Sequence, residues 1–343
     1  MADDLERSVA PRLGLSQSEV AKLGGFGVLR ESVKVFGGLH PSLVWIQFCL
    51  VLPYSLYLVV DQYAQQAILN KLVPNLPGGD VPWPSWDEIE TGIAHLDLSK
   101  WLGILLLVGL VVLSFAISLV ILATVFYAVG AIYYGRSATF SEVVHSVPRL
   151  WSRLFVTAVV DGLLVLSVGV AYAGFVVIFK LGVPANKLVL VVSIFAAIFF
   201  IPLFILNLIY QVANGVTCFE DHCGTTAFRK GKHLLHGKWW SALVLFILLL
   251  IPSILVTLLI DFPDRLTTEF HWRWLVLTIV YVFFTSYLTE LICVSWAVFY
   301  FSCAANYELY VAPTQQEDNL ESGYQEIPVT FLDDVFCCHP QII

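Results

Sequence analysis

The sequence is short of charge. Only 13% of its 343 residues are Asp, Glu, Lys or Arg, against roughly 25% in a typical soluble domain. It also lacks a basic tract or an alternation of basic and aromatic residues, so no nucleic-acid partner is expected. Hydrophobic residues make up 58% of the chain and the mean hydropathy is +0.82. This composition excludes an ordinary soluble protein and predicts an integral membrane protein.

The sequence also lacks the motifs of common enzymes. It contains no nucleotide-binding loop, nucleophile elbow, His-Glu-x-x-His motif or dinucleotide fingerprint in its usual context, so neither an enzyme activity nor a cofactor is predicted. No Asn-x-Ser/Thr sequon occurs, and N-glycosylation is therefore not expected. Residues 1–24 are polar and mixed in charge, which indicates a cytosolic N-terminal segment rather than a cleaved signal peptide.

Cysteine is sparse, and its positions do not predict a disulfide framework. None of the seven cysteines falls in a segment that we assign to the outer side of the membrane. Cys218, His222 and Cys223 lie close together with Glu220 and Asp221, but their spacing matches no strong zinc pattern. We therefore predict no metal site and interpret this segment as a reduced cytosolic loop.

Long hydrophobic runs are abundant, and about 20 residues are enough to cross a bilayer. Only helices satisfy the backbone of a lipid-exposed span, so the predicted fold class is an all-α bundle of six transmembrane helices. We place the spans near residues 41–66, 101–134, 151–180, 187–216, 239–260 and 273–305. Pro53, Pro202 and Pro252 lie inside spans, where membrane helices tolerate kinks; at Pro202 and Pro252 the sequence does not distinguish a kinked span from a re-entrant one.

The distribution of Lys and Arg predicts the orientation. The first set of non-spanning segments holds twelve such residues, namely Arg7, Arg12, Lys22, Arg30, Lys34, Arg136, Arg149, Arg153, Arg229, Lys230, Lys232 and Lys238. The opposite set holds six, namely Lys71, Lys100, Lys180, Lys187, Arg265 and Arg273. The positive-inside rule therefore puts both termini in the cytosol.

Short amphipathic segments precede the first, third and fifth spans. They cover residues 27–36, 140–151 and 227–240, and their predicted apolar faces contain Leu29, Val33 and Phe36; Phe140, Val143, Val144, Val147 and Trp151; and Phe228, Leu234, Leu235 and Trp239. We interpret them as interfacial helices in three repeats of one helix plus a two-span hairpin. The alternative is that any basic inner loop resembles such a helix. Candidate lipid-headgroup residues are Arg136, Arg149, Arg229, Lys230, Lys232, Trp151, Trp239 and Trp240.

Two acidic segments lie outside the spans: an outer loop within the membrane domain, which we assign to residues 25–305, and a tail that follows this domain. The outer loop, residues 67–100, is rich in Pro and Trp and contains a short helix predicted near residues 85–95. The tail, residues 306–343, is predicted to be a disordered cytosolic extension. Its vicinal Cys337 and Cys338 are candidates for S-acylation.

Polar side chains within the spans are the remaining candidates for a site, because burial in lipid makes them costly. Asp161 lies in the third span and Glu290 in the sixth. Asn207, Gln211 and Asn214 share one face of the fourth span, so all three are expected to point into the bundle. These five groups either line a solute or proton path or serve as hydrogen-bond partners between helices.

The stretches ATVFYAVGAIYYGRSATFSEVVHSVPRLWSRLFVT (123–157) and QVANGVTCFEDHCGTTAFRKGKHLLHGKWW (211–240) carry a resemblance. The chain resembles a land-plant family of uncharacterised six-span membrane proteins and, more distantly, the membrane domain of some bacterial glycerophosphodiester phosphodiesterases. The likeness covers residues 25–305 and implies a fold without an activity.

Two functional hypotheses follow. The first is a non-enzymatic protein of the endomembrane system or plasma membrane that organises membranes, assists trafficking or acts as a scaffold, with anionic lipids as partners. The second is a transporter or channel for a small or lipidic solute that uses Asp161, Asn207, Gln211, Asn214 and Glu290.

Overall fold

The computed structural model contains helices and no strands in the residues that it describes, which are 17–37, 41–72, 98–134, 140–182, 185–220, 222–266 and 271–307. The helices are α2 (Gln17–Ala21), α3 (Gly25–Gly37), α4 (Pro41–Ile46), a π-helix η1 (Gln47–Val51), α5 (Leu52–Leu72), α7 (Leu98–Tyr133), α8 (Phe140–Gly182), α9 (Ala185–Phe219), α10 (Thr225–Leu235), α11 (Trp239–Leu266) and α12 (His271–Asn306). The predicted outer-loop helix, most of the tail and Arg136 lie outside the described residues.

Six helical stretches are long and apolar enough to cross a membrane, which confirms the predicted fold class and number of spans. They form three hairpins, α5/α7, α8/α9 and α11/α12, whose members pack on each other. The α9 and α11 helices run without a break through Pro202 and Pro252. Both proline-containing spans are therefore continuous rather than re-entrant.

The first span changes its helical geometry just before Pro53. Residues Gln47–Val51 form a π-helix, and the Leu52 N–H reaches back to the Gln47 carbonyl. Proline has no N–H, and its ring clashes with the carbonyl four residues earlier in an α-helix. A wider π turn at that place accommodates the proline and keeps the span continuous.

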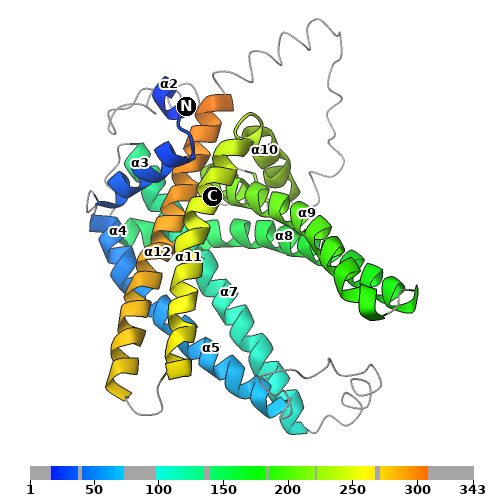
Figure 1. Cartoon of the computed structure of the whole chain (residues 1–343). Helices are drawn as coiled ribbons and strands as arrows, with labels where there is room; N and C mark the ends of the chain where they lie inside the picture. The colour runs from blue at the N-terminus through cyan, green and yellow to red at the C-terminus, as the bar shows by residue number, and fades with distance from the viewer. Residues whose placement is uncertain are drawn as a thin grey trace, which may run out of the picture.

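The second predicted interfacial segment is not a separate helix. Residues 140–151 form the first turns of α8, a single 43-residue helix that continues into the third span. Pro148 lies inside this helix. The first and third segments do form separate helices, α3 and α10, so each hairpin still follows a helical segment at the same end of the bundle (Figure 1). The internal sequence repeat itself stays a prediction.

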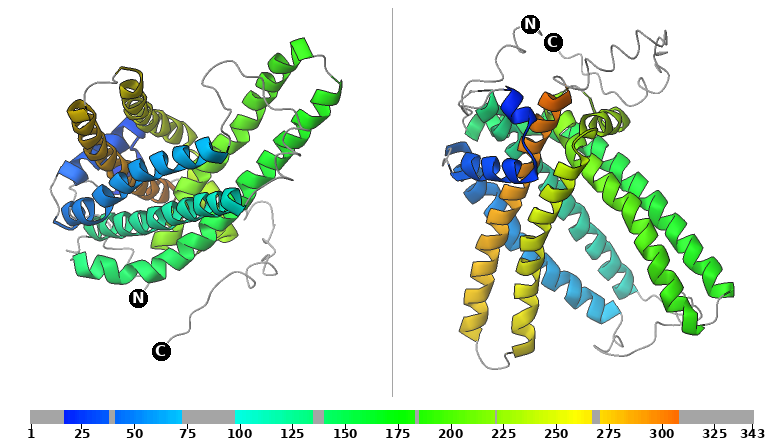
Figure 2. Two further views of the ribbon diagram at one scale, coloured as in Figure 1. Left: turned by 90° about the horizontal axis from the view of Figure 1, so that it is seen from below. Right: turned by 45° about the horizontal axis from the view of Figure 1, so that its top comes forward.

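The hydrophobic core lies toward one end of the molecule, which we call the packed end; it carries α2, α3, α10 and the last turns of α12 (Figure 1). Fully buried residues include Val28 of α3, Phe126 of α7, Leu208 of α9, Leu235 of α10 and Phe299 of α12. Both Figures 1 and 2 show the three hairpins spreading apart away from that end. The packed end therefore holds the tertiary contacts, and the far end consists of hairpins with few shared neighbours.

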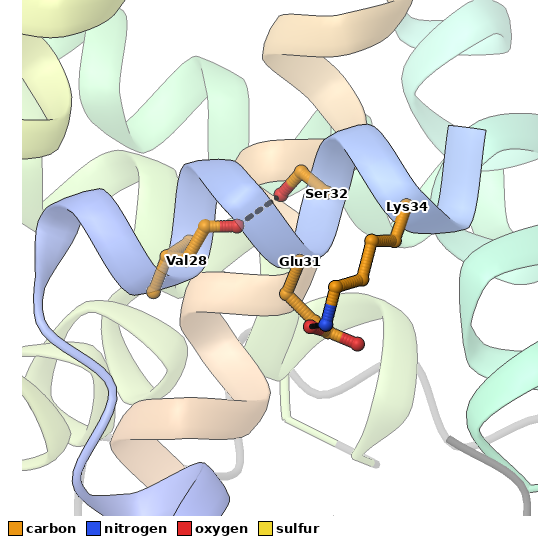
Figure 3. Close-up of polar contacts among 4 residues, drawn as sticks. All are labelled: Val28, Glu31, Ser32 and Lys34. Carbon is orange, nitrogen blue, oxygen red and sulfur yellow. Dashed lines mark hydrogen bonds and ion pairs between the residues drawn. The ribbon is translucent and has the colours of Figure 1, made fainter. Parts of the chain in front are cut away.

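The buried face of α3 differs from the predicted one. Its buried side chains are Val28, Glu31, Ser32 and Val35, whereas Val33 is exposed and Leu29 is only half-buried. Figure 3 shows how the polar members are satisfied: Ser32 donates to the Val28 carbonyl at 2.8 Å, and Lys34 pairs with Glu31 at 2.9 Å. Because α3 packs against both α11 and α12, the face that it buries is set by these two contacts and differs from the face predicted from the apolar residues.

Candidate functional site

A polar cluster at the packed end fixes α10 against the spans. The Glu220 carboxylate, just after α9, accepts a hydrogen bond from the Tyr300 hydroxyl at 2.7 Å and forms an ion pair with Lys230 of α10. The Glu220 main-chain carbonyl accepts a hydrogen bond from Arg153 of α8. Glu220 thus joins α8, α9, α10 and α12 through charge-assisted contacts, which are stronger than neutral ones.

A buried threonine pair lies beside this cluster. The hydroxyls of Thr157 and Thr217 are 2.9 Å apart, and the main-chain N–H of Gly224 donates to Thr157 at 3.0 Å. Gly224 has a positive φ of 61°, a conformation that glycine adopts without strain. The contact satisfies a buried N–H at the turn into α10 and thereby sets the direction in which α10 leaves the turn.

This docking divides α10 into two faces. Ala227, Phe228, Gly231, Leu234 and Leu235 are buried, and Gly231 lies against the α9 backbone, where an added Cβ would come 3.1 Å from the Ala213 nitrogen. The opposite face exposes Arg229, Lys232 and His233. Trp240, at the start of α11, is 80% exposed. We call Arg229, Lys232 and Trp240 the basic-aromatic surface.

The structure separates the remaining headgroup candidates. Arg149 is exposed on the first turns of α8, in keeping with a solvent or headgroup environment. Lys230 is engaged with Glu220. Trp151 is half-buried and stacks on Phe155 with a centroid distance of 5.5 Å, and Trp239 is half-buried against the core. Trp151 and Trp239 therefore pack within the protein, while Trp240 alone of the three candidate tryptophans projects outward.

The three polar residues of α9 do not all point into the bundle. Asn214 is buried, Gln211 is half-buried and Asn207 is exposed. Their spacing does place them on one face of the helix. The difference comes from their positions along α9. Its buried part begins at Leu208 and runs toward the C-terminal end of the helix, so Asn214 is covered, whereas Asn207 precedes this part and is uncovered.

Asp161 and Glu290 belong to different helix interfaces. Asp161 lies on α8 close enough to Tyr210 of α9 for an electrostatic interaction. Glu290 is fully buried on α12, one turn from Ser286, which accepts a hydrogen bond from Gln47 of η1 at 2.6 Å. Neither Glu290 oxygen nor Asp161 Oδ1 has a hydrogen-bond partner among the described residues. The structure thus does not gather the five intramembrane candidates into one site.

Three structurally important charged residues were not singled out from the sequence. Asp61 is buried in α5 and accepts a hydrogen bond from Gln65 at 2.7 Å; as an acid inside a predicted span, it could have been found by the rule that identified Asp161. Lys238 is buried and donates to the Leu23 carbonyl at 2.9 Å and to Ser302 at 2.6 Å. Glu220 and Lys238 lie in loops, where the sequence gives no signal of burial.

Comparison with known proteins gives a family without an assigned activity. A family model described as a domain of unknown function (DUF8558) matches residues 13–335, and the chain therefore belongs to that family. No curated protein and no solved structure matches the chain.

Proposed function

We propose that this DUF8558 member is a non-enzymatic membrane-organising protein, acting as a scaffold or in trafficking, that binds anionic lipid headgroups through its basic-aromatic surface. The observation that carries the proposal is the exposure of Arg229 and Lys232 on α10, together with the 80% exposed Trp240 at the start of the next helix, α11. A cation next to an exposed tryptophan at the end of a membrane span is typical of the lipid–water interface.

The rigid attachment of α10 supports this assignment. Its apolar face packs on α9, and Lys230 is held by Glu220, so α10 presents its basic side without having to fold at the membrane. An ordered cationic surface loses less conformational entropy on binding a headgroup than a flexible one does. We therefore propose α10 as a permanent amphipathic interfacial helix.

The same surface supports our proposal that the packed end faces the cytosol. Anionic lipids are concentrated in the cytosolic leaflet, where each nearby Lys or Arg contributes about 1 kcal/mol of attraction. The packed end, with Arg149, Arg229 and Lys232 exposed, would then face the cytosol in the endomembrane system or the plasma membrane. Asp161 and Glu290 lie on different helices, α8 and α12, and Asn207 is exposed, which disfavours a transport path through these residues.

The test compares the wild-type protein with a double variant that carries both Arg229→Gln and Lys232→Gln. Both are reconstituted into phosphatidylcholine vesicles with and without phosphatidylserine, and native mass spectrometry counts the phosphatidylserine that remains bound. Loss of two interfacial cations removes about 2 kcal/mol, which is roughly a 30-fold weaker affinity. Added salt should weaken wild-type binding in the same direction.

Lys34→Gln serves as the matched control, because Lys34 is also exposed at the packed end but is paired with Glu31 of its own helix. It should retain wild-type lipid binding. If the double variant binds as much phosphatidylserine as the wild type, the proposal is wrong. If Lys34→Gln loses as much as the double variant, the effect is one of overall charge rather than of this surface.

A further inference from the structure

The far halves of α7 and α8, where the structure describes their side chains, are exposed on nearly every side. In α7, residues 103, 104, 107, 110 and 114 form one half-buried stripe, and Tyr57 of α5 donates to the Leu110 carbonyl at 3.0 Å. Val111, Val112 and Leu113 are all about half exposed or more. Consecutive helical residues are 100° apart, so these three cover most of the surface that α5 leaves free.

The α8/α9 hairpin repeats this pattern. Residues 162–167 of α8 are all exposed, and Tyr172 contacts Phe199 of α9 at a centroid distance of 5.5 Å. An added Cβ would meet nothing within 4 Å at Gly109, Gly162 or Gly169. A helix inside a closed bundle would instead bury a second stripe against a neighbouring hairpin. Each far half thus contacts its own hairpin partner and little else among the described residues.

Helix length agrees with this spreading. The apolar stretch Trp101–Tyr133 has 33 residues, which at 1.5 Å per residue amounts to about 50 Å. The hydrocarbon core of a bilayer is about 30 Å thick. A span of this length fits only if it tilts strongly or projects beyond the lipid. Figure 2 shows the hairpins diverging from the packed end, and helices that diverge in this way are tilted relative to one another.

We propose that acyl chains from the leaflet opposite the packed end lie between the three hairpins and form part of the folded membrane domain. The lining favours lipid, because no charged residue occurs between Lys100 and Arg136, and the exposed side chains in the far halves of α7 and α8 are almost all apolar. A second copy of the chain would cover one side of a hairpin, whereas the exposure extends around the described far parts of α7 and α8. Phe204 of α9, in contact with Phe246 of α11, marks where the hairpins begin to separate.

The experiment uses a photo-crosslinking amino acid placed singly at Val111, Val112 and Leu113 of α7, and at Leu163, Leu164 and Val165 of α8. All six positions are exposed, so the substitutions should leave the fold intact. The full-length protein is reconstituted in vesicles of phosphatidylcholine, irradiated, and analysed by mass spectrometry. Val125 and Leu154, both fully buried at the packed end, are the matched controls.

The expected result is a phosphatidylcholine adduct at all three consecutive positions of each helix and crosslinks within the protein at both control positions. A crosslink from any of the six positions to another hairpin of the same chain would mean a closed bundle and overturn the proposal. A crosslinked dimer would show that a second copy occupies the space, which also overturns it. Lipid adducts at Val125 would mean that the packed end is not packed.

Discussion

Gly215 provides a sensitive test of the packed end, because α9 lies tightly against Tyr300 of α12 there. A Cβ at this position would lie 2.5 Å from two ring carbons of Tyr300 and 2.7 Å from its Cβ. The Tyr300 Cβ cannot move away without its backbone, so Gly215→Ala must push α12 outward or displace the Tyr300 hydroxyl from Glu220. We expect the change to lower the stability of the folded protein.

The magnitude follows from two opposing terms. Overpacking a close contact costs about 1–3 kcal/mol, and replacing Gly by Ala within a helix returns about 0.5–1 kcal/mol. The net loss is about 0–2.5 kcal/mol, and for a chain of 343 residues, with an unfolding entropy of about 2.1 cal/mol/K per residue, a loss of 1 kcal/mol lowers Tm by about 1–2 °C. Thermal unfolding in nanodiscs, followed by tryptophan fluorescence, would therefore show Tm lower by up to a few degrees.

Gly162→Ala is the matched control. It makes the same chemical change within a membrane helix, but nothing lies within 4 Å of the added Cβ. Its Tm should equal that of the wild type or exceed it slightly. Equal Tm values for Gly215→Ala and Gly162→Ala would refute the close α9–α12 contact and, with it, the geometry of the Glu220 cluster.

Two further substitutions test the polar contacts at the same end. Thr157→Val removes the acceptor of the Gly224 N–H and the contact with the Thr217 hydroxyl, which still donates to the Ala213 carbonyl. The unpaired N–H should cost about 1–3 kcal/mol, whereas Thr157→Ser should unfold like the wild type. A Thr157→Val protein of unchanged Tm would contradict the contact. Lys238→Met should free α2 and make the chain before α3 more sensitive to protease, because the Leu23 carbonyl and Ser302 lose their donor. Burial lowers the pKa of Lys238 and outweighs the opposing attraction to Cys303, so the side chain loses its proton more easily in the folded protein than in the unfolded chain. The unfolded chain then binds more protons between the lowered pKa and 10.5, and the stability of the wild type relative to Lys238→Met should rise with pH in that window. A fall in that window would be inconsistent with a buried lysine.

The amino-acid sequence by itself determined the fold class and the number of spans, because a run of more than 20 apolar residues in lipid has no other way to satisfy its backbone. It also identified the buried face of α10, where Phe228, Leu234 and Leu235 recur at helical spacing. These are local properties, and each depends only on residues that are near one another in the chain.

Only the tertiary structure decided how deep a residue lies and what covers it. Asn207 and Asn214 share a helix face, yet one is exposed and the other buried, because the hairpins separate between them. Val33 of α3 faces outward and Glu31 inward, because α11 and α12 contact this helix from two sides. Glu220 and Lys238 acquire their partners from helices up to 215 residues away in the chain. No periodicity encodes such contacts, since they arise only when the hairpins pack together.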